Sequence, residues 1–124
     1  MKTSDYKELI VWQKAMALCK DVYALTKAFP KEELFGITNQ MRRCAVSIPS
    51  NIAEGQARHS PKEFIHFLKI SYGSLAELET QLLISLNIGF ISEEQIKTLL
   101  ENLQEIERML MGLVRSIEKE TSKN

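Results

Sequence analysis

Hydrophobic residues recur at steps of three and four along most of the chain, which is the spacing of one face of an α-helix. In the first segment this seam consists of Ala15, Leu18, Val22, Leu25 and Phe29. Further large residues flank it and widen the apolar surface beyond what one neighbouring helix would cover: Trp12, Met16, Cys19 and Tyr23. The pattern predicts a helix over residues 8–28. Pro30 ends it, because a residue before proline is pushed out of the helical conformation.

The second segment centres on residues 40–55, which read QMRRCAVSIPSNIAEG. Its apolar face consists of Met41, Cys44, Ile48 and Ile52. Another face carries a polar stripe: Gln40, Arg43, Ser47, Ser50 or Asn51, and Glu54. We expect a two-faced helix over residues 36–55.

Pro49 lies inside that second helical pattern. Proline lacks a backbone N–H and crowds the carbonyl of the residue four positions earlier, Ala45, so a bend is expected there. Ser47, Ser50 and Asn51 are close enough in sequence to hydrogen-bond the freed carbonyl. Gly55 suits a left-handed residue that caps the end of the helix.

Two more helices follow, over residues 61–88 and 92–119. The first opens on Ser60, with proline at its first position and glutamate at its third, and Gly89 suits its end. The second opens on Ser92, with Gln95 three residues later, and keeps an uninterrupted seam from Ile96. Short connections between four amphipathic helices predict one all-α domain over residues 1–124, an up-down-up-down antiparallel four-helix bundle with long helices and a proline kink in the second.

Several separated motifs occur in a recognisable order: Trp12-Gln13-Lys14-Ala15-Met16, Phe29-Pro30, Glu33-Leu34-Phe35-Gly36, residues 40–55 and residues 73–82. In this respect the chain resembles the small four-helix-bundle proteins encoded in intervening sequences of bacterial 23S rRNA genes, historically labelled a ribosomal protein. The same fold family includes the accessory protein of diversity-generating retroelements, whose members are barrel-like homopentamers that bind nucleic acid and a reverse transcriptase. The resemblance implies a homo-oligomer, a pentamer by analogy.

Composition and charge limit the kinds of function that the chain could have. The 124 residues are 44% hydrophobic and 26% charged, which suits one soluble domain with one core. Sixteen basic and sixteen acidic residues cancel, so a nucleic-acid site must be local. No apolar run approaches the ~20 residues of a membrane span. We expect a cytoplasmic protein whose isolated Cys19 and Cys44 stay reduced, with no disulfide, metal or cofactor.

Surplus apolar surface around Trp12 suggests that the bundle is not finished as a monomer. The segment 61–88 adds a stripe of small residues, Gly73, Ala76 and Thr80, which would let another helix approach closely. A neighbour within the same chain explains both features equally well on the sequence alone. The resemblance favours the interpretation as an oligomer interface.

No catalytic constellation stands out. His59 and His66 are seven residues apart, too far for a one-turn metal pair on a helix. Glu77 and Glu79 project in different directions around a helix, so they do not form a carboxylate pair. The glycines are scattered singly and form no phosphate-binding loop. We therefore expect a protein that is not an enzyme.

A local basic cluster is the remaining candidate site. It comprises Arg58, Lys62 and Lys69 near the start of the third helix, with Arg42 and Arg43 on the second. In a closed ring each subunit would repeat these cations, and the resulting band would contact several phosphates. Phe64 and Phe67 are predicted core residues, so recognition of the RNA backbone or shape is favoured over base stacking.

Two alternatives stay open for these cations. Arg42 or Arg43 would instead pair with Glu54, or with Glu77 or Glu79 of a neighbouring subunit, and the lysines would simply be solvated. The leading hypothesis is a non-enzymatic, oligomeric accessory protein that binds structured RNA. The alternative is a protein-interaction scaffold for a reverse transcriptase or a ribosomal component.

Overall fold

The computed structural model describes residues 5–122 and is helical throughout its regular elements, which confirms the predicted all-α bundle. Within that range, long helices follow one another in the order α1 (Ile10–Thr26), α2 (Ile37–Ala57), α3 (Pro61–Asn87) and α4 (Glu93–Ser122). Short 3₁₀ turns precede the first two, η1 (Tyr6–Glu8) and η2 (Lys31–Glu33). Residues 1–4 and 123–124 of the predicted domain lie outside the described residues.

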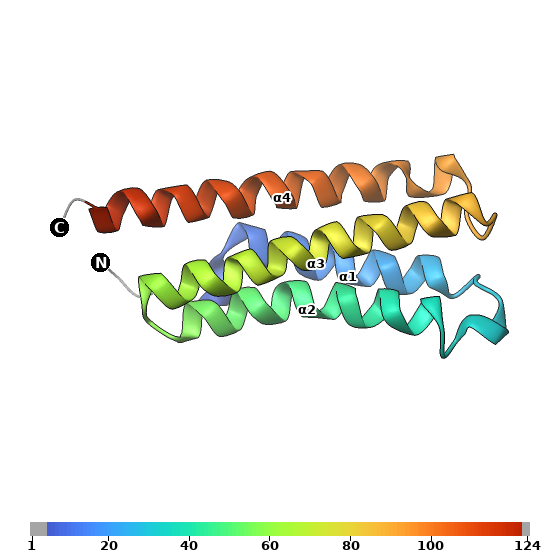
Figure 1. Ribbon diagram of the computed structural model, residues 1–124, viewed down its shortest axis with the longest axis horizontal. Coiled ribbons are helices and arrows are strands. Elements are labelled where there is room, and N and C mark those ends of the chain that lie inside the picture. The colour runs from blue at the N-terminus through green and yellow to red at the C-terminus, as the bar shows by residue number, and fades with distance from the viewer. Residues whose placement is uncertain (1–4, 123–124) are drawn as a thin grey trace.

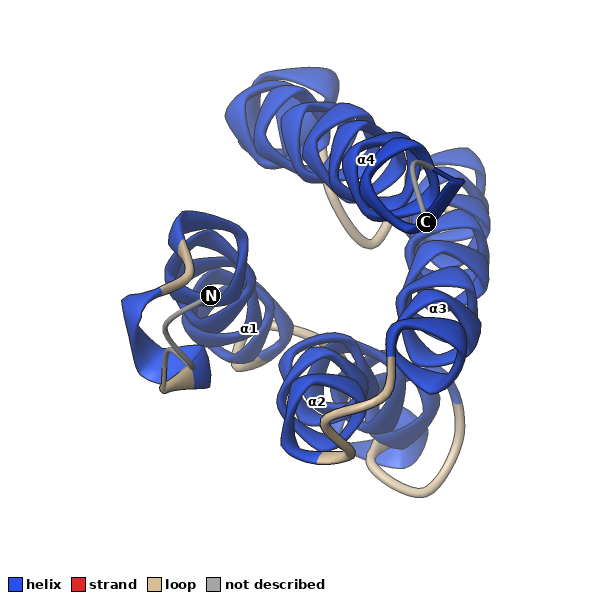
Figure 2. Ribbon diagram, turned by 90° about the vertical axis from the view of Figure 1, so that its left-hand side faces the viewer, coloured by secondary structure: helices blue, strands red, loops and turns tan. Residues whose placement is uncertain are grey.

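The helices run alternately up and down, and each packs on the next (Figure 1). Viewed along the bundle, they follow one another around a central core (Figure 2). The contact between α2 and α3 is the most extensive, whereas α4 returns to α1 more loosely. There the ammonium of Lys14 pairs with the Glu105 carboxylate at 3.1 Å. The α1–α2 and α3–α4 connections lie at one end of the bundle, and the α2–α3 connection lies at the other (Figure 1).

The core consists of the seams that the periodicity predicts. Its largest side chains are fully buried: Leu18, Met41, Ile48, Ile52, Leu68, Leu75, Leu78, Leu82, Leu103, Ile106 and Leu110. Burying a leucine or isoleucine of this kind contributes ~1.5–3 kcal/mol each. The residues that flank the seam of the first helix differ in burial. Trp12 and Cys19 are half-buried, whereas Met16 and Tyr23 are exposed.

The predicted helix ends are correct to within a few residues, and the capping signals at Ser60, Ser92 and Gly89 are confirmed. The Ser60 hydroxyl accepts a hydrogen bond from the Glu63 amide at 3.3 Å. Ser92 and Gln95 form a reciprocal capping box, with bonds of 2.8 and 3.2 Å. Gly89 has a φ of 86°, the left-handed conformation expected after α3. The largest difference is at the end of α4, which continues to Ser122 instead of ending at residue 119. At the start of the chain, the separate turn η1 precedes α1, which begins at Ile10 instead of residue 8.

The interpretation of Gly55 as a left-handed cap is wrong. α2 continues to Ala57, and the left-handed residue is His59, with a φ of 55°. Gly55 is a buried helical residue at the contact with α3. A Cβ added there would lie 2.6 Å from the Cβ of Phe67 and 3.2 Å from Phe64 Cδ1. The hydrogen side chain is therefore what lets α2 and α3 approach each other at this level.

This contact predicts that Gly55→Ala destabilises the protein. Alanine favours a helix over glycine by about 1 kcal/mol, but overpacking against Phe67 costs roughly 1–3 kcal/mol, since that neighbour is not the free end of a flexible side chain. Gly112→Ala is the matched control, because its Cβ would meet only Arg115 Nη2, at 3.9 Å. Urea unfolding at fixed protein concentration should place Gly55→Ala below wild type and Gly112→Ala at or above it. Equal stabilities of the two variants would contradict the close contact.

Candidate nucleic-acid interface

Small polar side chains join α2 to α3 at Ser47 of the predicted polar stripe and at Cys44 and Ile48 of the neighbouring apolar face. The Cys44 thiol donates a hydrogen bond to the Ser74 carbonyl at 3.0 Å. The hydroxyls of Ser47 and Ser74 are hydrogen-bonded at 2.8 Å. The Ser71 hydroxyl donates to the Ile48 carbonyl at 2.9 Å. Part of this stripe therefore serves packing within the subunit and holds the two helices in register.

The same region contains Pro49, which is buried, and α2 runs through it without a break. The Ser47 hydroxyl donates to the carbonyl of Cys44 at 2.6 Å, and the Asn51 amide donates to that of Ser47 at 2.7 Å. The expectation that Ser47 and Asn51 satisfy the Ala45 carbonyl is therefore wrong, because each donates to a neighbouring carbonyl instead; for Ser50 it stays a prediction. The bend at Pro49 stays a prediction.

Arg42 faces the first helix rather than the basic cluster. Its Nε donates to the Thr26 hydroxyl at 2.9 Å, and its guanidinium lies 4.8 Å from the centre of the Tyr23 ring. The Thr26 hydroxyl in turn donates to the Val22 carbonyl at 2.8 Å. This buried threonine was not singled out from the sequence, and its partner lies sixteen positions away. Arg42 thus joins α1 to α2.

Arg58 is held by its own hairpin. One guanidinium nitrogen lies 2.9 Å from Glu54, another lies 3.5 Å from Glu63, and the group stacks over Phe67 with 5.1 Å to the ring centre. The hydrogen bond that Arg58 donates to Glu54 is the main reason that the pKa of Arg58 is raised. The interpretation that Glu54 pairs with Arg42 or Arg43 is therefore wrong, since its partner is Arg58. These two carboxylates offset much of the positive charge at the turn.

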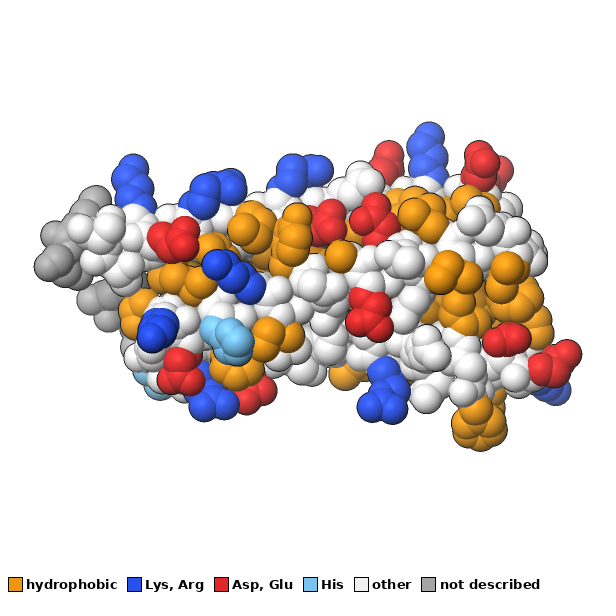
Figure 3. Space-filling model, viewed as in Figure 1, with side chains coloured by type: hydrophobic (Ala, Val, Ile, Leu, Met, Phe, Trp, Pro, Cys, Tyr) orange, Lys and Arg blue, Asp and Glu red, His pale blue; other side chains and the backbone are white. Residues whose placement is uncertain are grey.

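Two lysines remain as free cations at this end of α3. Lys62, His66 and Lys69 are spaced four and three residues apart, so they share one helical face, and all three are exposed. We call these three residues the α3 basic stripe. Within the described residues, neither lysine forms an ion pair. Blue and pale-blue side chains gather at the corresponding end of the surface (Figure 3).

Arg43 is also exposed, and within residues 5–122 it makes no ion pair. It lies fifteen positions before Arg58, which corresponds to about 22 Å along the helix at ~1.5 Å per residue. The predicted five-residue cluster is therefore divided. Arg42 and Arg58 are engaged within the subunit, Arg43 stands apart, and Lys62 and Lys69 share a face.

The predicted oligomer interface is accessible in part. Gly73, Ala76 and Thr80 are exposed on α3, and a Cβ added at Gly73 would meet nothing within 4 Å. Trp12 is half-buried and packs edge-on against Tyr6, with 5.4 Å between the ring centres. Their role in assembly stays a prediction.

The acidic residues give no separate site. Burial raises the pKa of Glu107, the nearby charge of Glu79 adds to this, and Arg108 opposes it. Across residues 5–122, no group of three or more histidine, cysteine, aspartate or glutamate residues is placed to hold a metal ion. None of the described helices is both long and apolar enough to cross a membrane.

The fold and its polar α2–α3 contact define a class of small, antiparallel four-helix bundles. The model of the 23S rRNA-intervening sequence protein family matches residues 7–112, and the chain belongs to that family. The fold is similar to a crystal structure of a protein with unknown function from the S23 ribosomal protein family of Bacteroides thetaiotaomicron VPI-5482, with a TM-score of 0.76 and 23% identity. That similarity covers 85% of this chain and 98% of the other. No curated protein matches the chain significantly.

The α2–α3 contact also predicts a dependence of stability on pH. Burial raises the pKa of the Cys44 thiol to about 12, and the charge of Glu77 adds to this. An unfolded thiol has a pKa of about 8.5. The buried neutral thiol therefore contributes stability fully below about pH 8.5, and this contribution is lost as the pH rises toward 12.

Cys44→Ala removes both the hydrogen bond and the titration. We expect the variant to be less stable than wild type at pH 7, with a difference that narrows between pH 8.5 and 10. The measurement is the free energy of urea unfolding for both proteins across that range. A difference that stays constant with pH would show that Cys44 does not contribute this dependence.

Proposed function

We propose that this protein is a non-enzymatic, oligomeric accessory protein that binds structured RNA through the α3 basic stripe. The family description supports an RNA-associated role, since it refers to intervening sequences of 23S rRNA. The observation that carries the proposal is that Lys62 and Lys69 are exposed on one face of α3 and form no ion pair with any residue from 5 to 122. These cations are available to an external anion, unlike Arg42 and Arg58.

The stripe suits phosphates better than bases. Lysine is a flexible point charge that binds phosphates without requiring a fixed geometry. The nearby aromatic rings, Phe64 and Phe67, are half-buried in the α2–α3 contact. They therefore offer no open platform on which bases would stack. Recognition of this kind favours the backbone and shape of a folded RNA over its sequence.

One stripe alone would bind weakly, because the chain has no net charge and Glu54 and Glu63 lie beside it. Assembly overcomes this limit. Several copies of the stripe on one oligomer would bind one RNA together, and each phosphate that is neutralised would release counterions. The exposed face of Gly73, Ala76 and Thr80 supports such an assembly, because small side chains let another helix approach closely.

The proposal predicts that Lys62→Gln with Lys69→Gln weakens RNA binding without changing the fold or the assembly. The probe is a transcript of the 23S rRNA helix that carries an intervening sequence. Removing a lysine that neutralises one phosphate should flatten the slope of log affinity against log salt, by roughly 0.7 to 0.9 for each such phosphate. Fluorescence anisotropy over a series of salt concentrations measures both the affinity and the slope.

The matched control is Lys20→Gln with Lys27→Gln. These two exposed lysines are also seven positions apart, but they lie on α1 and its C-terminal end. The control has the same charge change and should keep most of the affinity and the salt slope. Equal losses in the two double variants would indicate a non-specific charge effect. Unchanged binding in the α3 variant, or no RNA binding by wild type, would favour the scaffold that binds a reverse transcriptase or a ribosomal component.

A further inference from the structure

Phe35 is the most exposed large hydrophobic side chain among the described residues, at 92%. It lies in the connection between α1 and α2, two residues before α2 begins, and its neighbour Leu34 is 48% exposed. Aromatic side chains of this size bury about 150–250 Å² when they pack. Among residues 5–122, nothing covers this side chain, so Phe35 protrudes from the isolated bundle as apolar surface in water.

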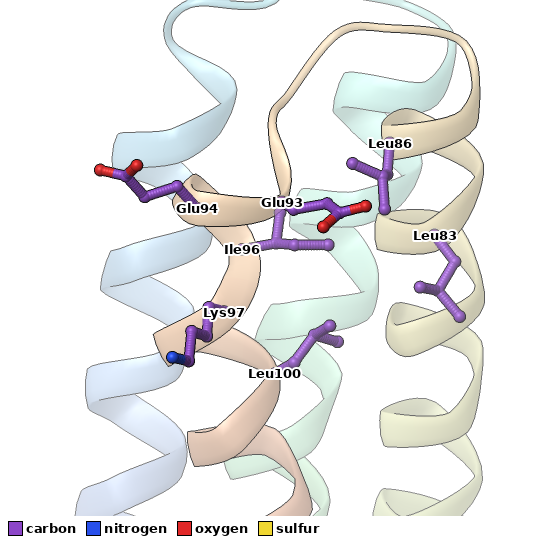
Figure 4. A pocket seen from close by; sticks show the side chains of 7 residues that line it. All are labelled: Leu83, Leu86, Glu93, Glu94, Ile96, Lys97 and Leu100. Carbon is purple, nitrogen blue, oxygen red and sulfur yellow. The ribbon is translucent and has the colours of Figure 1, made fainter.

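An open groove lies between the end of α3 and the start of α4 (Figure 4). Its volume is about 480 Å³, within the range of sites that hold an apolar group. Four aliphatic side chains make up its apolar lining: Leu83, Leu86, Ile96 and Leu100. Charged residues complete the lining: Glu93, Glu94 and Lys97. The groove therefore offers apolar walls with a charged rim.

The protruding side chain and the groove lie at the same end of the bundle. Phe35 belongs to the α1–α2 connection, and the groove adjoins the α3–α4 connection; both connections are at one end (Figure 1). The exposure of Phe35 shows that it does not fill the groove of its own chain. A second copy turned about an axis roughly parallel to the helices would bring its Phe35 to the groove at the same height.

We propose that Phe35 of one copy inserts into the α3–α4 groove of a second copy. This inference rests on the assembly in the proposed function and identifies its contact. The two surfaces are different, so the contact is head-to-tail, and each copy would offer one side chain and one groove. Phe35 and the groove lie at the same level along the helix axis. Repeated rotation about an axis parallel to the helices would therefore close a ring instead of extending a filament.

The rest of α3 supports a second copy as the occupant. The groove continues into the exposed side chains of Leu83 and Ile84, and then into the small residues from Thr80 back to Gly73. A stable interface needs about 800 Å² from each partner, more than Phe35 alone supplies. The continuous α3 face would provide the remaining area, with Phe35 as the anchor.

Charge also suits this pairing. Lys31 and Glu32 are exposed shortly before Phe35, and the groove carries Glu93 and Lys97 at its rim. Both surfaces thus offer both signs for contacts around the apolar anchor. Lys62 and His66 of the α3 basic stripe lie toward the opposite end of α3, beyond this contact, whereas Lys69 lies one turn before Gly73 on the same face and would border it.

The test uses two variants of the full chain, Phe35→Ser and Leu83→Glu. Both positions are exposed, so the monomer fold should survive, as circular dichroism would show. The first variant keeps an intact groove, and the second keeps an intact Phe35. Each alone should associate roughly 30-fold more weakly than wild type, the loss typical of removing an interface anchor. An equimolar mixture should form one-to-one dimers by light scattering, because one complementary pair of surfaces remains.

Ile10→Ser is the matched control, because Ile10 is 56% exposed but begins α1 at the other end of the bundle. It should assemble as wild type does. Wild-type assembly in both Phe35→Ser and Leu83→Glu would overturn the inference, as would a mixture that stays monomeric. If wild-type assembly depends on Phe35 but the assembly binds no RNA, the contact is supported and the proposed RNA function is rejected. A failure of the contact can therefore be told apart from a failure of the RNA function.

Discussion

The close approach of α2 and α3 is the constraint on which the rest of the structure depends. There is no room for a Cβ at Gly55 beside Phe67, so the backbone of α2 packs there directly against the Phe67 side chain of α3. Ser71, Ser74 and Cys44 then hold the helices together by hydrogen bonds to backbone carbonyls and hydroxyls. Such bonds satisfy polar groups that burial would otherwise penalise. The contact fixes the hairpin from which α1 and α4 take their positions.

The fold was predictable because periodicity and capping act locally. A seam of apolar residues and a Ser60 or Ser92 cap depend only on positions a few residues apart, and these elements are confirmed. Gly55 was misinterpreted for the opposite reason. A glycine near a helix end suits a left-handed cap, and only the distant Phe67 shows that it is instead a packing residue. Local sequence cannot separate the two roles.

The candidate site was predictable only in outline. Counting cations pointed to the α2–α3 hairpin, but charge alone does not show which side chains are already engaged. Arg42 donates a hydrogen bond to Thr26, sixteen positions away, and Arg58 forms an ion pair with Glu54, one helical turn earlier. The spacing of Lys62 and Lys69 on one face was readable from the sequence. That neither lysine forms an ion pair within the described part of the chain could be seen only from the positions of the surrounding carboxylates.

The two ends of the bundle expose different kinds of side chain. The α2–α3 turn carries Arg58, Lys62 and the start of the α3 basic stripe, whereas the opposite end exposes Leu34, Phe35 and Ile88. Net charge is zero, and Glu54 and Glu63 pair with Arg58, so the free positive charge at this end belongs to the α3 basic stripe. An apolar end that joins copies would align their basic ends on one side of the assembly. Modest local charge would then act as a multivalent surface, because several weak phosphate contacts on one rigid body reinforce one another.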